Sequence, residues 1–129
     1  MSPAINLVTL TAAALELGLC GYYYYAAYDA ARLWLPYPLQ ERRTARFGFD
    51  RFIFRPAMPR AARRRYLIAH VFGCLGFVSL AILAFANGPR AGGLAFAALS
   101  LLAFGQTCLD WRKDRRLRQA KVSPPASAP

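Results

Sequence analysis

The sequence has few of the groups that enzymes use for catalysis. Its 129 residues include one histidine and six acidic residues, and its three cysteines have no Cys-x-x-Cys spacing. No catalytic Ser/His/Asp pattern, glycine-rich phosphate loop or pair of haem-ligating histidines is present. The odd number of cysteines, all within apolar runs, also argues against a disulfide framework. We therefore expect a protein that is not an enzyme and that has no cofactor.

Basic residues, in contrast, are abundant and are separated from the apolar ones. Apolar residues make up 57% of the chain, yet its formal net charge is +11. None of the 17 lysines and arginines precedes Arg32, ten lie between Arg32 and Arg65, one is Arg90, and six follow the last apolar run. This separation is typical of a membrane protein whose charge lies at the bilayer surface.

Three apolar runs are long enough to cross a bilayer, because about 20 helical residues span its hydrocarbon core. The predicted fold class is an all-α integral membrane protein with transmembrane helices over residues 4–28, 66–86 and 91–110. Between and around them we expect a flank at 1–3, a loop at 29–65, an external turn at 87–90, a basic tail at 111–122 and a disordered tail at 123–129. Glycine and prolines in the arginine-rich loop favour short helical pieces, lying partly in the membrane interface.

The distribution of charge also predicts the topology. Clustered arginines and lysines are retained on the cytoplasmic side of a membrane. The loop and the basic tail are therefore expected inside, which gives an external N-terminus and a cytoplasmic C-terminus. No basic residue precedes the first apolar run, so we expect it to be a retained span and not a secretory signal. The richness in alanine, arginine and proline is typical of a high-GC bacterium, and the predicted location is the bacterial inner (cytoplasmic) membrane.

Anionic lipid headgroups are the expected partner of the basic residues, each contributing about 1 kcal/mol near the surface. A nucleic acid is not the predicted partner, because a basic loop held at the membrane already accounts for the arginines. The candidate headgroup contacts are Arg42, Arg43, Arg46, Arg51, Arg55, Arg63, Arg64, Arg65, Arg112, Lys113, Arg115 and Arg116.

Glu16 is the foremost candidate for a functional group, because an ionisable side chain within a membrane span is costly. Ser79 and Ser100, at about the same depth on the second and third spans, could both bond to it. Three interpretations are open: a neutral carboxyl held by these hydroxyls, a proton- or cation-binding carboxylate, or a contact with another protein.

His70 completes the predicted intramembrane polar site. Cys74 lies one turn further along the same helix face, and Cys20 is expected at a similar depth. These side chains could in principle bind a soft metal, but a spacing motif and a fourth ligand are missing, so no metal site is predicted. A hydrogen bond from His70 to Tyr23, to Asp29 or to a partner is the preferred interpretation.

Asp110 and Asp114 lie one helical turn apart, as do carboxylates that bind magnesium in some lipid-phosphate enzymes. Four basic residues surround them: Arg112, Lys113, Arg115 and Arg116. Local ion pairs in a solvated basic helix are therefore the preferred interpretation. A lipid-modifying or lipid-sensing protein that combines these carboxylates with the segment from Phe47 to Arg55 is a weaker hypothesis.

Small residues recur at helical spacing and predict faces where helices approach closely. They can serve either to pack the three spans together or to bind another protein. The predicted packing positions are Ala13, Gly18, Cys20, Gly73, Cys74, Ala97 and Ala103.

These features favour a non-catalytic accessory or assembly subunit of a larger inner-membrane complex. The alternative is a small oligomeric transporter or channel, in which Glu16 from several copies forms a proton or cation site. In having an acidic residue midway along its first span, the chain resembles the small multidrug resistance transporters. Those proteins have four spans and a short loop, whereas three spans and a long basic loop are predicted here.

Overall fold

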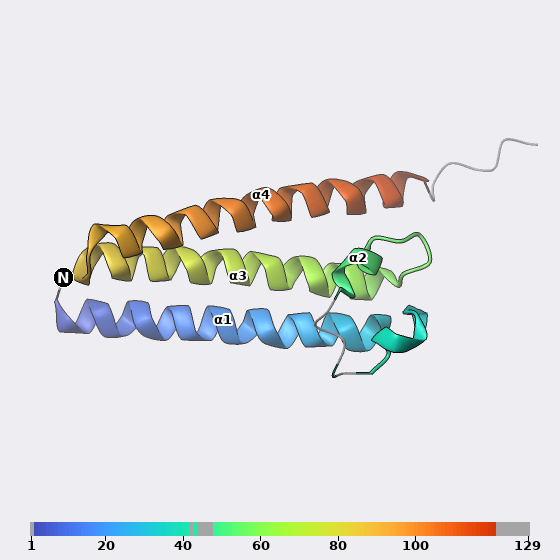
Figure 1. The fold of residues 1–129 in the computed structure, drawn as a ribbon, viewed down its shortest axis with the longest axis horizontal. Helices are drawn as coiled ribbons and strands as arrows, with labels where there is room; N and C mark the ends of the chain where they lie inside the picture. The colour runs from blue at the N-terminus through green and yellow to red at the C-terminus, as the bar shows by residue number, and fades with distance from the viewer. Residues whose placement is uncertain (1, 42, 44–47, 121–129) are drawn as a thin grey trace, which may run out of the picture.

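The structure is a computed structural model that describes residues 2–41, 43 and 48–120. These residues form an all-helical fold without strands, as expected. Three long helices, α1 (Pro3–Ala31), α3 (Arg60–Asn87) and α4 (Arg90–Ala120), lie side by side (Figure 1). The connection between α1 and α3 contains the short helix α2 (Asp50–Ile53) and two 3₁₀ turns, η1 (Arg32–Trp34) and η2 (Tyr37–Leu39).

All three long helices have the length and the apolar composition that crossing a membrane requires. Within the most apolar stretch of each, only 6% of the residues in α1, 28% in α3 and 17% in α4 are buried inside the protein. Leucine, valine and phenylalanine side chains therefore cover much of the outer surface of the helices. Such a continuous apolar surface is unusual for a soluble monomer.

The helices are longer than the apolar runs that predict them. Ser2 accepts a hydrogen bond from the backbone N–H of Ile5 and so caps α1, which continues to Ala31. α3 begins directly after Pro59, so the basic segment 60–65 is already helical. α4 likewise continues through the basic segment to Ala120. Hydropathy marks the apolar part of each helix, whereas proline and polar caps determine where the helix begins.

The central helix of the three is α3. It packs against α1 on one side and α4 on the other, while α1 and α4 have no extensive contact with each other (Figure 1). Glycines permit both close approaches: a Cβ atom at Gly76 would lie 2.7 Å from the side chain of Leu17, and one at Gly93 would lie 2.4 Å from the ring of Phe85. The result is an open row of three helices.

Polar side chains fix the register of α1 against α3 at the end opposite the arginine-rich one. The side-chain amides of Asn6 and Asn87 donate to each other's carbonyl oxygens, at 2.7 and 2.9 Å. Asn87 also donates to the backbone carbonyl of Leu83. A reciprocal amide pair needs both side chains at one level, so the pair favours a single alignment of the two helices.

The other end contains the main apolar core. Phe49, fully buried, lies with its ring centroid 5.0 Å from that of Tyr24, 5.6 Å from Tyr28 and 5.9 Å from Tyr66. Other buried members of the same cluster are Ala27, Ala31, Leu35, Ile53, Met58 and Ala62. The described part of the loop thus packs onto the helix ends. Its alternation of apolar and basic residues instead predicts that the aromatic rings lie in the membrane interface. Phe47 lies outside the described residues.

Candidate functional site

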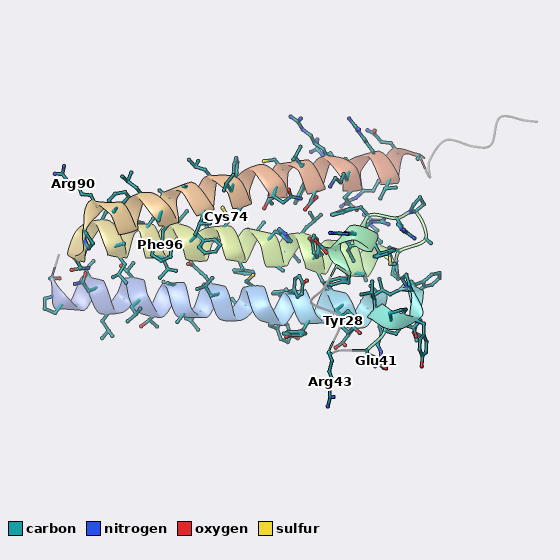
Figure 2. The ribbon with its side chains drawn as sticks, viewed as in Figure 1. Tyr28, Glu41, Arg43, Cys74, Arg90 and Phe96 are labelled. Carbon is teal, nitrogen blue, oxygen red and sulfur yellow. The ribbon has the colours of Figure 1, made fainter. Side chains whose placement is uncertain are left out.

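The described basic residues gather at one end of the molecule. They lie on the loop, on the first turns of α3 and on the last turns of α4, whereas Arg90 is at the opposite end (Figure 2). Two of the predicted headgroup contacts, Arg42 and Arg46, lie outside the described residues. The exposed ones are Arg43, Arg51, Arg55, Arg64, Arg65, Arg112, Lys113, Arg115 and Arg116.

Arg63 differs from the other predicted headgroup contacts, because it faces the protein interior. Its side chain is only 2% exposed, and its Nε donates to Oδ1 of Asp114 at 2.9 Å. Its Nη1 donates to the carbonyl of Met58 at 2.9 Å. The position of Arg63 on α3 directs it toward α4, so it connects α3, α4 and the end of the loop and cannot reach a lipid phosphate.

Asp110 and Asp114 are both buried and both bonded to neighbouring side chains. Asp114 also pairs with Arg118, and Asp110 accepts from Lys113 at 3.0 Å and from Gln106 at 3.1 Å. Within the described ranges, no three His, Cys, Asp or Glu side chains are placed to hold a metal ion. Asp114 therefore holds α4 to Arg63 of α3, whereas the partners of Asp110 lie on α4 itself.

Glu16 is joined to the neighbouring helix by Ser79, whose Oγ donates to Oε2 of Glu16 at 2.7 Å. Ser100, which the depth of the spans also places at this level, instead lies beside Cys74. The sulfur of Cys74 is 3.7 Å from the Ser100 carbonyl oxygen and 3.8 Å from its hydroxyl. Ser100 is on α4, on the far side of α3 from α1, so only Ser79 reaches Glu16.

His70 does not join the two cysteines in a common site. Its Nδ1 is 3.0 Å from the backbone carbonyl of Tyr66, and the two rings lie 4.3 Å apart between centroids. Cys20 faces Gly73, while Cys74 faces α4. The histidine therefore has a partner one turn back on its own helix, and neither Tyr23 nor Asp29 provides it.

Most of the predicted small-residue positions pack within the chain. Ala13 is buried, Cys20 and Gly73 meet between α1 and α3, and Ala97 and Ala103 are half-buried on the face of α4 that carries the buried Ser100. Gly18 is the exception: it is exposed, and a Cβ atom placed there would have no neighbour within 4 Å.

A groove of about 1060 Å³ crosses α3 at the basic end, between α1 and α4. One part of it is lined by Arg60, Arg64, Arg65 and Arg118. The other part is apolar and aromatic, lined by Tyr23, Leu67, Ile68, Val71 and Trp111. Neither composition nor the distribution of charge predicts this groove. Its signal is the recurrence of arginine and then aliphatic residues at helical spacing along one face of residues 60–71.

No family model, curated protein or solved structure matches this chain.

Glu16, Asp110 and Asp114 each have a hydrogen-bonding partner within the chain. In the described part of the chain, the exposed arginines, the groove and the outer face of α1 around Gly18 are surfaces open to another molecule. All three suit binding to lipid or to another protein.

Proposed function

We propose that this chain is a multi-pass protein of the bacterial inner membrane, with its N-terminus outside and its C-terminus in the cytoplasm. Support comes from three apolar helices whose basic residues gather at one end. With that end in the cytoplasm, the exposed arginines lie among anionic headgroups, which attract them.

Within the membrane, the protein acts as a non-catalytic accessory or assembly subunit of a larger complex. The observation that carries this proposal is the outer face of α1, where Gly18 is exposed in a helix whose apolar stretch is 6% buried. Leucine and valine side chains can face either lipid tails or another protein, so they do not indicate a partner. A glycine on the outer face does, because it lets another helix approach closely. The occupant of this face is thus a helix of a partner protein.

The alternative, an oligomeric transporter built around Glu16, has less support from the geometry. A site shared between copies needs the carboxylate directed away from its own chain. Here the carboxylate bonds to Ser79 of the adjacent helix, which favours a role in holding α1 to α3. A second copy of this chain on the Gly18 face would give a homo-oligomer without making Glu16 a transport site.

The test is purification of the full-length protein from its own membranes in mild detergent, with the native mass and every co-migrating chain determined. We expect a larger membrane protein in fixed stoichiometry. Gly18→Leu is expected to reduce its recovery by about tenfold, because a leucine there adds a clash in the contact with the partner.

The matched control is Gly105→Leu on α4. Gly105 is also exposed, and a Cβ atom there would also meet nothing within 4 Å. The exposed Leu101 and Leu109, one turn away on either side, keep another helix at a distance there, whereas the small Ala14 lies one turn before Gly18. This variant should retain the partner. Recovery of the wild type as a lone chain would contradict the accessory role, and equal losses in the two variants would remove the assignment of the contact to α1.

A further inference from the structure

We infer that the groove at the basic end is a binding site for one anionic phospholipid. Its phosphate lies among Arg60, Arg64 and Arg118, and an acyl chain follows the apolar face of α3. This inference rests on the membrane location proposed above, to which it adds a specific ligand site.

The first argument is the charge of the groove. Its lining contains four arginines and no acidic residue. Within the described residues, Arg60 and Arg64 have neither an ion pair nor a hydrogen bond from their side chains, whereas Arg65 donates to the carbonyl of Ala26. Arg118 shares Asp114 with the buried Arg63. The groove therefore has an excess of guanidinium donors, which suits a phosphate group.

The second argument is the order of side chains with depth. The contact between Arg63 and Asp114 sets the level of the antiparallel helices α3 and α4. Counting residues along both helices from this contact, in opposite directions, places Arg118 level with the start of α3. The same count places Trp111 level with residues 66–67. From the end inward, the lining thus passes from guanidinium groups through an indole to aliphatic side chains. A phospholipid in one leaflet presents the same sequence of phosphate, interface and hydrocarbon.

The third argument is the dimensions. A volume of about 1060 Å³ exceeds the upper end of small-ligand pockets, about 1000 Å³, so it admits a headgroup with part of a chain. Along α3, Arg64 and Val71 are about 10 Å apart, which is within the thickness of about 15 Å of one leaflet. A soluble phosphate would need the arginines alone and would leave the apolar part of the groove without a role.

The test uses native mass spectrometry of the full-length protein in mild detergent, titrated separately with phosphatidylglycerol and phosphatidylcholine. We expect one phosphatidylglycerol to bind about tenfold more tightly than phosphatidylcholine. Arg60→Gln combined with Arg64→Gln should weaken phosphatidylglycerol binding by about tenfold. The control pair, Arg32→Gln with Arg90→Gln, also removes two exposed arginines. Both lie outside the groove and neither is a predicted headgroup contact, so the affinity should be unchanged.

A second pair of variants tests the acyl-chain part. Val71→Trp fills the groove, whereas Val78→Trp makes the same change at an equally exposed position of α3 outside it (40% and 41% exposed). Only Val71→Trp should lower the affinity. Glycerol phosphate, which has no acyl chain, should not compete at concentrations that saturate the site with lipid.

Equal losses in the groove and control variants would overturn the inference, as would equal affinity for the two lipids or full competition by glycerol phosphate. Recovery of the partner protein is measured on the same variants. A groove variant that loses lipid but retains the partner supports the lipid site. Loss of the partner from Gly18→Leu with lipid binding intact bears only on the accessory role, so the two proposals fail separately.

Discussion

At the scale of single residues, Asp114 links α4 to α3 through a buried ion pair with Arg63. Its two carboxylate oxygens accept from different arginines, Arg63 on α3 and Arg118 on α4. Both Arg63 and Asp114 are almost fully buried, at 2% and 3% side-chain exposure, so neither can replace a lost partner with water. Removing one partner of such a pair leaves an uncompensated buried charge, which is more costly than the net value of the pair.

We therefore expect Asp114→Leu to destabilise the folded protein by about 3–5 kcal/mol, because the guanidinium of Arg63 would keep only the carbonyl of Met58. Adding Arg63→Met should recover most of this loss, since two apolar side chains then replace the ion pair. Unfolding in mixtures of SDS and mild detergent measures both free energies.

The control is Arg115→Ala, the exposed neighbour of Asp114 on the same helix, which should change stability by no more than about 0.5 kcal/mol. If Asp114→Leu left the stability unchanged, or if the double variant were no more stable than the single one, the ion pair of Arg63 and Asp114 would not be what holds α4 to α3.

At the scale of elements, α3 is the helix on which the others depend, because α1 and α4 both pack against it. Gly76 leaves room for a side chain of α1: a Cβ atom there would lie 2.7 Å from Cδ2 and 2.8 Å from Cγ of Leu17. A larger residue would need α1 or the Leu17 side chain to move.

Gly76→Leu is accordingly expected to destabilise the α1–α3 contact by about 1–3 kcal/mol through overpacking. Leu17→Ala in the same chain should restore part of this stability by removing the opposing side chain. Gly105→Leu is the matched control, since a side chain there meets nothing within 4 Å. The same detergent unfolding assay would contradict the packing if the Gly76 and Gly105 variants were equally stable.

The sequence predicts the elements better than their lateral arrangement. Apolar run length predicts three helices long enough to cross a membrane, and all three are present. Depth along a helix can also be counted, which brings Ser79 and Ser100 to the level of Glu16. Which serine makes the bond depends on the order of the helices, and α3 separates Ser100 from α1. Periodicity within one helix contains no information about that order.

The fate of individual arginines could not be predicted for a similar reason. Arg63 and Arg64 are adjacent in a basic run, yet Arg63 is buried against Asp114 and Arg64 lines the groove. Amino-acid composition cannot distinguish the buried arginine from the exposed one. The difference arises from the turn of 100° between neighbouring helical residues, which is about 3.6 residues per turn, and from where α4 and Met58 lie. The burial of Phe49 likewise depends on partners distant in sequence, Tyr24 and Tyr66.

At the scale of the whole molecule, charge asymmetry is the dominant feature. One end combines the described loop with the start of α3 and the end of α4, while Arg90 is the only basic residue between the second and third apolar runs. Since retention of clustered arginine on the cytoplasmic side orients membrane proteins, one orientation should be strongly preferred. The lipid groove and the exposed arginines would then face the same, inner leaflet.

The expected topology can be checked by labelling intact cells with a membrane-impermeant maleimide. Arg90→Cys, at the start of α4, should react from outside, whereas Arg116→Cys should react only after the membrane is permeabilised. Both positions are exposed in the structure, so a difference in labelling reports the side of the membrane and not burial. The native Cys20, Cys74 and Cys108 lie within the apolar runs. The unsubstituted protein should therefore not be labelled, and it serves as the background control. Labelling of Arg116→Cys in intact cells would reverse the orientation and place the arginines outside, where attraction to the anionic cytoplasmic leaflet could not hold them.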